Sequence, residues 1–145
     1  MKPHGSDSIF KQERNSDLMR AYHELVTAKE FVCVSEIYNE VVNMPSRRFW
    51  VSEERAAIVI SAMMRGNSLK AMRETKREMF EEIYRRAMSV KKAHPQMSMF
   101  EIACIVVHQP APKFYITPGS ASVYIINSKK KWYEERKRKL RHLFM

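Results

Sequence analysis

The sequence predicts a mainly α-helical protein built from two diverged copies of a three-helix, helix-turn-helix-like unit, with a short extended segment before each third helix. Three observations carry this prediction. The 145-residue chain contains an internal repeat, its apolar residues recur at helical spacing, and hydroxyl residues and prolines stand where helices would begin and end. With 45% apolar residues the chain can form a core, so we expect an ordered protein.

The repeat is a gap-free alignment of residues 36–60 with residues 101–125, at a constant offset of 65. Eight of the 25 aligned positions are identical. The clearest shared run is Arg-Phe-Trp-Val-Ser at positions 48–52, which returns as Lys-Phe-Tyr-Ile-Thr at positions 113–117. The predicted division is a first repeat over residues 8–66, a linker over 67–74, and a second repeat over 75–145 that ends in a long basic helix.

The first helix of each copy is predicted from apolar residues three and four positions apart. In the second copy Phe80, Ile83 and Tyr84 belong to such a stripe, and Leu18 and Tyr22 repeat it in the first copy. A hydroxyl and a carboxylate three residues apart form a capping box, which predicts a helix start at Thr75-Lys76-Arg77-Glu78. This helix should end before Pro95, because the residue before a proline disfavours helical backbone.

The second helix of the second copy is expected to begin at Ser98, since Ser98 and Glu101 have capping-box spacing. Ile102, Val106 and Val107 would form its apolar face, and Pro110 lies just beyond its end. The first copy repeats this face at Ile37, Val41 and Val42, and Pro45 follows it. Both copies therefore predict a short helix that ends before a proline.

Two short segments, residues 48–51 and 113–116, follow these prolines and are rich in aromatic and branched side chains, which is typical of extended backbone. Successive side chains of an extended segment point to opposite sides. We therefore assign Phe49 and Phe114 to the core and leave Trp50 and Tyr115 open between core and surface. Four residues are too few to predict that the two segments pair.

The third helices are predicted from their N-caps. Ser52 precedes two acidic residues, and Thr117 precedes a proline, which are both favourable helix starts. In the first copy Gly66 is a natural stop. The second copy has no such stop, so residues 120–142 are expected to continue as one long helix.

The charge of the chain favours polyanionic partners. Its 26 Lys and Arg exceed its 16 Asp and Glu, which gives a net charge of +10. Eight of these cations and only two Glu lie between Lys129 and His142, with Trp132 and Tyr133 interleaved, a pattern that suits phosphate neutralisation and base stacking. A solvated helix face and a helix lying on a membrane surface are the alternatives. The candidate nucleic-acid-binding residues of this segment are Lys129, Lys130, Lys131, Arg136, Lys137 and Arg138.

Three helices of which the third opens with a hydroxyl cap resemble the helix-turn-helix family of DNA-binding modules, most clearly from Ser98 onward. The resemblance implies a supporting helix over residues 98–109 and a recognition helix that starts at Thr117, with Ala121, Tyr124 and Ile125 facing inward. It also implies that Thr117 holds a phosphate and that Ser120, Ser122, Val123 and Asn127 face base edges. The chain departs from the family in its turn, since residues 110–116 make it longer than the roughly three or four residues that the family uses.

A second candidate surface combines cations with aromatic rings in the repeated run. It consists of Arg47, Arg48, Trp50, Lys113 and Tyr115. Glu53 and Glu54 would repel phosphates from the third helix of the first copy. The second copy is therefore expected to be the main DNA-binding unit.

Other classes of function have little support. The chain has three glycines and no Gly-rich phosphate loop, and no nucleophile and base at a recognised spacing, so we expect neither an enzyme nor a cofactor. Cys104 and His108 lie four apart, but a zinc site needs about four ligands, so no metal is expected. The two cysteines lie in apolar surroundings, and no secretion signal or membrane-spanning stretch is evident, which favours the cytoplasm.

The leading interpretation is a non-enzymatic nucleic-acid-binding protein that acts on duplex DNA, as a transcription regulator or an accessory factor in DNA transactions. The alternative is a structural or adaptor protein whose basic helix docks an acidic protein partner. A third possibility is binding of RNA or single strands through Trp50, Tyr115 and Trp132. Two units in one chain would not require a dimer, although a homo-oligomer stays possible.

Overall fold

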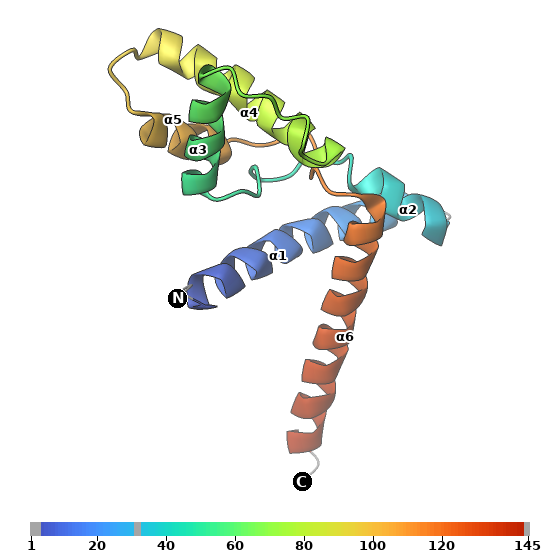
Figure 1. Ribbon diagram of the computed structural model, residues 1–145. Helices are drawn as coiled ribbons and strands as arrows, with labels where there is room; N and C mark the ends of the chain where they lie inside the picture. Colours follow the sequence, from blue (N-terminus) through green and yellow to red (C-terminus); the bar gives the residue numbers. More distant parts are fainter. Residues whose placement is uncertain (1–3, 31–32, 144–145) are drawn as a thin grey trace. The chain divides into compact units, whose positions relative to one another are not determined.

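The computed structural model describes residues 4–30 and 33–143, and within these ranges it contains six helices and no strand (Figure 1). The prediction of a mainly helical fold is confirmed. The helices are α1 (His4–Ala28), α2 (Val34–Val41), α3 (Glu53–Met64), α4 (Glu74–Ala93), α5 (Met99–Val107) and α6 (Pro118–Leu143). None of them is long and apolar enough to cross a membrane, in the part of the chain just described.

The helices pack into two compact units, which are not formed by contiguous halves of the chain. Unit 1 joins the segment up to Val42 with the segment from Thr117 onward, so that α1, α2 and α6 pack on one another. Unit 2 covers residues 43–116, in which α3, α4 and α5 pack together. Each unit therefore takes two helices from one sequence copy and the third helix from the other, a grouping that differs from the contiguous repeats 8–66 and 75–145.

The third helices carry the same residues at the positions that they bury. Helix α3 begins at Glu53 and α6 at Pro118, which keeps the offset of 65 residues. Ala56 and Ile60 of α3 are fully buried, and so are their counterparts Ala121 and Ile125 of α6. Because both helices present an alanine and an isoleucine four residues apart, either one suits either pair of partner helices. The inward orientation expected for Ala121 and Ile125 is confirmed, while Tyr124 is half-buried.

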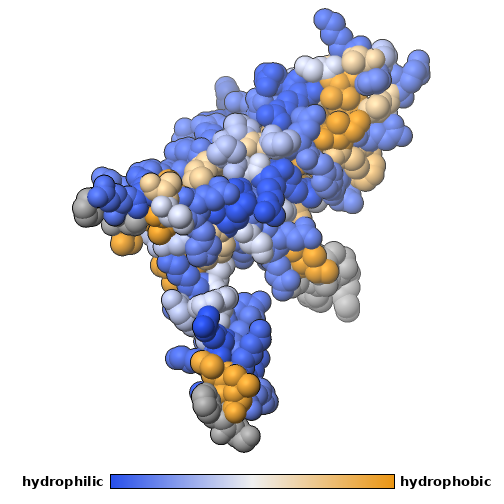
Figure 2. Space-filling view, turned by 180° about the vertical axis from the view of Figure 1, so that it is seen from behind, coloured by the Kyte–Doolittle hydropathy of each residue, from blue (hydrophilic) through white to orange (hydrophobic). Residues whose placement is uncertain are grey.

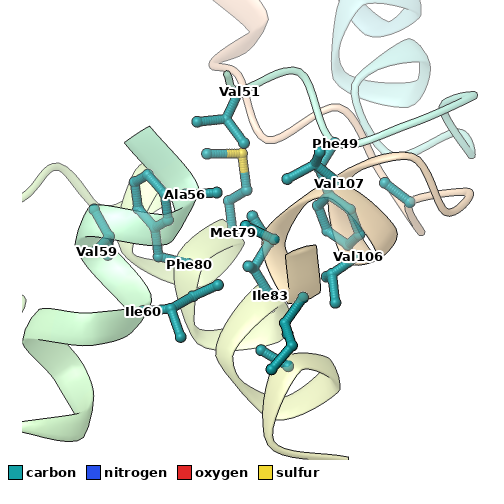
Figure 3. Close-up of a cluster of buried hydrophobic side chains, with 14 of the residues drawn as sticks. Phe49, Val51, Ala56, Val59, Ile60, Met79, Phe80, Ile83, Val106 and Val107 are labelled. Carbon is teal, nitrogen blue, oxygen red and sulfur yellow. The ribbon is translucent and has the colours of Figure 1, made fainter. Parts of the chain in front are cut away.

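The core of unit 2 is formed by apolar side chains from all three of its helices and from the segments that connect them (Figure 3). Their periodicity explains the burial, since Met79, Phe80, Ile83 and Ala87 lie on one face of α4. The cluster comprises Phe49, Val51, Ala56, Val59, Ile60, Met79, Phe80, Ile83, Ala87, Ile102, Ala103, Val106, Val107, Ala111 and Tyr115.

Hydroxyl caps set the starts of α3, α5 and α6. The side chains of Ser52, Ser98 and Thr117 accept hydrogen bonds from the backbone N–H three residues later, at 3.1 to 3.2 Å, which confirms all three predicted N-caps. The capping box predicted at Thr75 is wrong. Helix α4 already begins at Glu74, so Thr75 lies inside the first turn, and the N-cap residue Arg73 makes no side-chain cap.

The helix ends also follow the sequence. Gly66 follows α3 with a φ of 90°, a left-handed conformation that glycine adopts without a Cβ clash, so the predicted stop is confirmed. Helix α4 ends at Ala93, before Pro95, and α5 ends at Val107, before Pro110. The predicted continuation of the last helix over residues 120–142 is confirmed by α6.

The residue after each proline takes part in one antiparallel bridge in unit 2, which lies just before the two predicted segments, residues 48–51 and 113–116. Ser46 and Ala111 exchange two backbone hydrogen bonds of 3.0 Å. Phe49 then donates its N–H to the carbonyl of Val107 at 3.0 Å, which fixes its ring at the end of α5. The expectation of extended backbone is wrong at Tyr115, whose φ of 57° is left-handed, so the second segment turns there.

The burial of each ring shows which aromatic residues of the two runs belong to the core. Phe49 and Phe114 are buried, as expected. Of the two rings left open, Tyr115 is buried and stacks on Phe49 with 6.0 Å between ring centroids, whereas Trp50 is half-buried. In an extended segment Phe114 and Tyr115 would point to opposite sides. The left-handed turn at Tyr115 breaks this alternation, so both side chains are buried.

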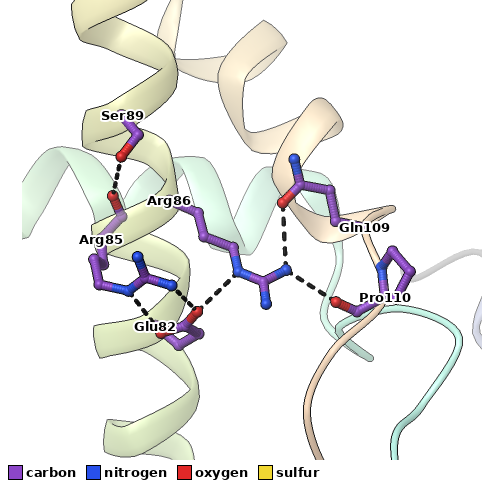
Figure 4. Close-up of polar contacts among 6 residues, drawn as sticks. All are labelled: Glu82, Arg85, Arg86, Ser89, Gln109 and Pro110. Carbon is purple, nitrogen blue, oxygen red and sulfur yellow. Dashed lines mark hydrogen bonds and ion pairs between the residues drawn. The ribbon is translucent and has the colours of Figure 1, made fainter.

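A charged network fastens α4 to the end of α5 (Figure 4). Glu82 accepts hydrogen bonds from Arg85 and, at 2.8 Å, from Nε of Arg86. Arg86 also donates to the carbonyl of Pro110 at 2.9 Å and to the side chain of Gln109 at 3.3 Å. The hydrogen bonds from Arg85, and then those from Arg86, lower the pKa of Glu82, although burial opposes them.

The lowered pKa of Glu82 predicts a specific dependence of stability on pH. The carboxylate stabilises the folded state above its ordinary pKa of 4.5, and this contribution is lost as the pH falls through the lower folded-state pKa. Glu82→Gln should therefore reduce the free energy of unfolding at pH 7 by roughly 1 kcal/mol. Urea denaturation at pH 7 and at pH 3 should show that the difference between variant and parent shrinks at the lower pH. Glu81→Gln, an exposed neighbour on α4, is the control, and an equal effect of both variants would contradict this role of Glu82.

Candidate nucleic-acid interface

The candidate residues from the repeated run lie in unit 2, where internal contacts engage most of them. Arg48 is half-buried and donates to the carbonyls of Phe49 at 3.1 Å and Val51 at 3.0 Å. Its guanidinium also lies 3.5 Å from Glu53 and 5.2 Å from the ring centroid of Trp50. Arg48 thus stabilises the segment that it belongs to.

The matching residues of the second run are engaged in the same way. Lys113 forms an ion pair of 2.7 Å with Glu78 of α4, and its ammonium lies 5.3 Å from the ring centroid of Tyr115. Burial raises the pKa of Tyr115 and covers its ring. Arg47 is exposed on the same unit. The structure therefore gives Arg48, Lys113 and Tyr115 clear structural roles.

An acidic residue of α3 is also neutralised inside unit 2. Glu53 contacts Arg48 and, at 2.8 Å, Nε2 of His108. Burial alone would raise the pKa of Glu53, but the hydrogen bond from its own backbone N–H and the contacts with Arg48 and His108 lower it. His108 therefore has a structural partner, and no group of three metal-binding side chains occurs among the residues described.

Most hydroxyl groups at the start of α6 form hydrogen bonds with neighbouring residues of the same helix start. Thr117 accepts from the backbone N–H of Ser120 at 3.1 Å and donates to the Ser120 hydroxyl at 3.0 Å. Ser122 donates to the carbonyl of Gly119 at 2.7 Å. Val123 and Asn127, one turn apart, are exposed. Of the polar side chains predicted to face base edges, Asn127 is the one that points to solvent without such a local bond.

Lys129 marks the point at which α6 leaves its partner helices in unit 1. Its ammonium donates to the hydroxyl of Tyr22 at 2.6 Å and lies 4.3 Å from the centroid of that ring. Closer to the start of α6, the guanidinium of Arg14 lies 4.2 Å from the ring centroid of Tyr124. These two contacts join α6 to α1. Lys129 therefore holds the unit together, unlike the cations that follow it.

Beyond Lys129, every residue of α6 up to Leu143 is exposed, and we call residues 130–143 the distal segment. It contains seven Lys and Arg and two Glu. None of these seven cations forms an ion pair within the part of the chain that the structure describes. In Figure 2 this helix is hydrophilic over most of its visible surface, with an apolar area near its end. Its cations are thus available to an external anion.

Helical spacing divides the distal segment into two faces. Glu134, Lys137, Arg138 and Arg141 stand at helical positions i, i+3, i+4 and i+7 and line one shallow hollow. Lys130 continues this row one turn earlier, and we call Lys130, Lys137, Arg138 and Arg141 the cationic face. Trp132, Glu135, Arg136 and Lys139 have the same spacing and line a second hollow. Lys139 and Arg141 are not among the candidates named from the sequence, but their spacing from Arg136 and Lys137 places them on these faces.

These features define a class: a basic, mainly α-helical protein in which the exposed cations of one long helix form no ion pair with the residues that the structure describes. Comparison of the chain with protein-family models, with curated proteins and with solved structures found no match.

Proposed function

We propose that the protein binds nucleic acid, with duplex DNA as the preferred form, and that it acts without catalysis as a regulator or accessory factor in DNA transactions. The observation that carries this proposal is the distal segment of α6, whose seven cations are exposed and have no ion pair among the described residues. The cations of unit 2 at Arg48, Lys113 and Arg86 are instead neutralised by neighbouring carboxylates.

The geometry of α6 suits a regular polyanion. At 1.5 Å per residue, the cationic face from Lys130 to Arg141 extends over roughly 16 Å on a rigid helix. A B-DNA major groove is about 12 Å wide and admits an α-helix. Lysine and arginine along that helix would neutralise phosphates and release their counterions, which is a sequence-independent source of affinity.

The start of α6 supplies the groups for base recognition in this proposal. Val123 and Asn127 are exposed one turn apart, immediately before the cationic face. Asparagine pairs with adenine in the major groove, and an apolar side chain contacts the thymine methyl. In a helix-turn-helix-like arrangement α6 would be the recognition helix and α2 its supporting helix, because α2 packs against α6 within unit 1.

A salt series with a charge-neutralised variant tests the proposal. The variant replaces Lys130, Lys137, Arg138 and Arg141 by glutamine. Fluorescence anisotropy with a labelled duplex should show tight binding at low salt that weakens steeply with added salt. If the four cations contact phosphates, the slope of log K against log salt should fall by about 3 to 4 in the variant, at ~0.9 for each contact.

The matched control removes the same charge from unit 2, by replacing the exposed residues Arg65, Arg73, Lys76 and Lys92 with glutamine. This variant should retain most of the affinity and the salt slope of the parent. Equal losses in both variants would show that net charge alone drives binding. Absence of binding to duplex at low salt would contradict the proposal.

A second candidate function is that of an adaptor whose basic helix docks an acidic protein. The observation that favours it is the exposure of two leucines on the distal segment, Leu140 at 46% and Leu143 at 76%. Apolar residues among cations suit an acidic amphipathic partner helix. Nucleic acid that accompanies the protein through purification and is removed by high salt would favour DNA binding over this alternative.

A further inference from the structure

Two aromatic rings lie next to each other on the distal segment, and the fold does not use either of them. Trp132 is 52% exposed and Tyr133 is 57% exposed. Their centroids are 5.0 Å apart, with ring planes inclined by 76°. Both residues lie beyond Lys129, the last residue of α6 that contacts α1 in the bonds described above. About half of each side chain is thus open to solvent and available to an external partner.

The surroundings of Trp132 contain the groups that recognise a nucleotide. The guanidinium of Arg136 lies 5.1 Å from the Trp132 ring centroid. Trp132 and Arg136 share a hollow of about 290 Å³ with Glu135 and Lys139. An indole ring stacks on a base, a carboxylate accepts from an exocyclic amino group, and cations hold the phosphate.

The hollow at Trp132 and the cationic face lie on opposite sides of α6. Trp132 and Arg141 are nine residues apart, so they lie on opposite sides of α6, since nine residues correspond to two and a half turns. A base inside a duplex presents only its edge, whereas an unpaired base presents its whole ring face. The cationic face thus suits phosphates of a duplex, and the Trp132 side suits a strand that has left the duplex.

We propose that Trp132, with Glu135, Arg136 and Lys139, forms a stacking site for an unpaired base. Among DNA molecules that contain a duplex, the protein therefore binds those with an adjoining single-stranded segment more tightly than fully paired ones. This inference rests on the proposed nucleic-acid binding and adds to it the kind of nucleic acid that is bound.

The test compares two labelled probes that share one duplex sequence, one blunt and one with a single-stranded tail of ten deoxycytidines, whose bases carry an exocyclic amino group. The parent protein should bind the tailed probe about tenfold more tightly, because stacking of one base contributes an effect of this order. Trp132→Ala should lose this preference while its affinity for the blunt probe stays within about twofold. Trp132→Phe, which keeps an aromatic face, should retain most of the preference.

Leu140→Ala is the matched control, since it removes an exposed apolar side chain of the same segment that cannot stack, and it should keep the preference. In a Trp50→Phe background Trp132 is the single tryptophan, and its fluorescence should be quenched by the tailed probe and little by the blunt one. Equal affinity of parent and Trp132→Ala for the tailed probe would overturn the stacking site and leave the duplex proposal standing. Failure of the parent to bind either probe at low salt would overturn both.

Discussion

A fragment of residues 43–116 is expected to fold cooperatively by itself. All three helices of unit 2 lie within these residues, and so does every residue of its buried cluster, from Phe49 to Tyr115. The bridge between Ser46 and Ala111 closes the unit near both ends of the fragment. A chain of this size is sufficient for a small domain. Circular dichroism should show a helical spectrum and a single sigmoidal urea transition.

The control fragment covers residues 67–116 and lacks α3. Its loss removes Ala56, Val59 and Ile60 from the buried cluster, so that α4 and α5 expose their apolar faces to water. We expect this fragment to be largely unfolded, since most helices in proteins depend on tertiary packing of their apolar face for stability. An unfolded 43–116 fragment would show that unit 2 needs the rest of the chain, against the packing described here.

Phe49→Ala is expected to reduce the free energy of unfolding of unit 2 by about 3 to 5 kcal/mol. The Phe49 side chain is 1% exposed and stacks on Tyr115. The guanidinium of Arg86 lies 4.9 Å from its ring centroid, so the ring also covers the network with Glu82. Two costs add up when the ring is removed: its burial is lost, and it leaves a cavity that the surrounding side chains fill only in part.

The matched control for this substitution is Ile58→Ala. Ile58 belongs to α3 in the same unit, but it is 60% exposed, so its truncation should change the free energy of unfolding by less than about 0.5 kcal/mol. Urea denaturation of the intact proteins, followed by circular dichroism, measures both variants. Similar effects of the two substitutions would contradict the central place of Phe49 in the core.

The local features of the fold were predictable because each has a short-range cause. Ser52, Ser98 and Thr117 cap helices through bonds to residues three positions later, and a cap of this kind depends on few neighbours. Gly66 ends α3 for an equally local reason. The failure at Thr75 shows the limit of such reasoning, because the N-cap is Arg73, two residues before the predicted one, and the capping box is not used.

The grouping of the helices was not predictable from the same patterns. The alanine and isoleucine that α3 buries recur in α6, so the sequence does not distinguish which pair of helices each one joins. That choice depends on contacts distant in sequence, such as the bond between Lys129 and Tyr22, which are 107 residues apart. The repeat shows that one pattern of residues occurs twice in the sequence. It does not indicate whether a helix packs with helices of its own copy or of the other copy.

The candidate site was predictable in composition and not in detail. The surplus of cations after Lys129 is visible in the sequence, but Arg48, Lys113 and Lys129 are cations as well. What separates them is whether a partner lies within reach, as Glu78 does for Lys113. Such partners come from other elements of the fold, so the number of charges identifies the candidates and the structure decides which of them stay available.

The distribution of unit 1 over both ends of the chain determines the order in which the protein is completed on the ribosome. Helices α1 and α2 are synthesised first, yet their partner α6 begins at Pro118. At about 5 to 20 residues per second, roughly 4 to 15 s separate the synthesis of these parts. Unit 2 lies wholly between them and is complete before α6 emerges. Helices α1 and α2 are therefore made before the helix that completes their unit, and the side chains that they pack against α6 stay uncovered until α6 is made.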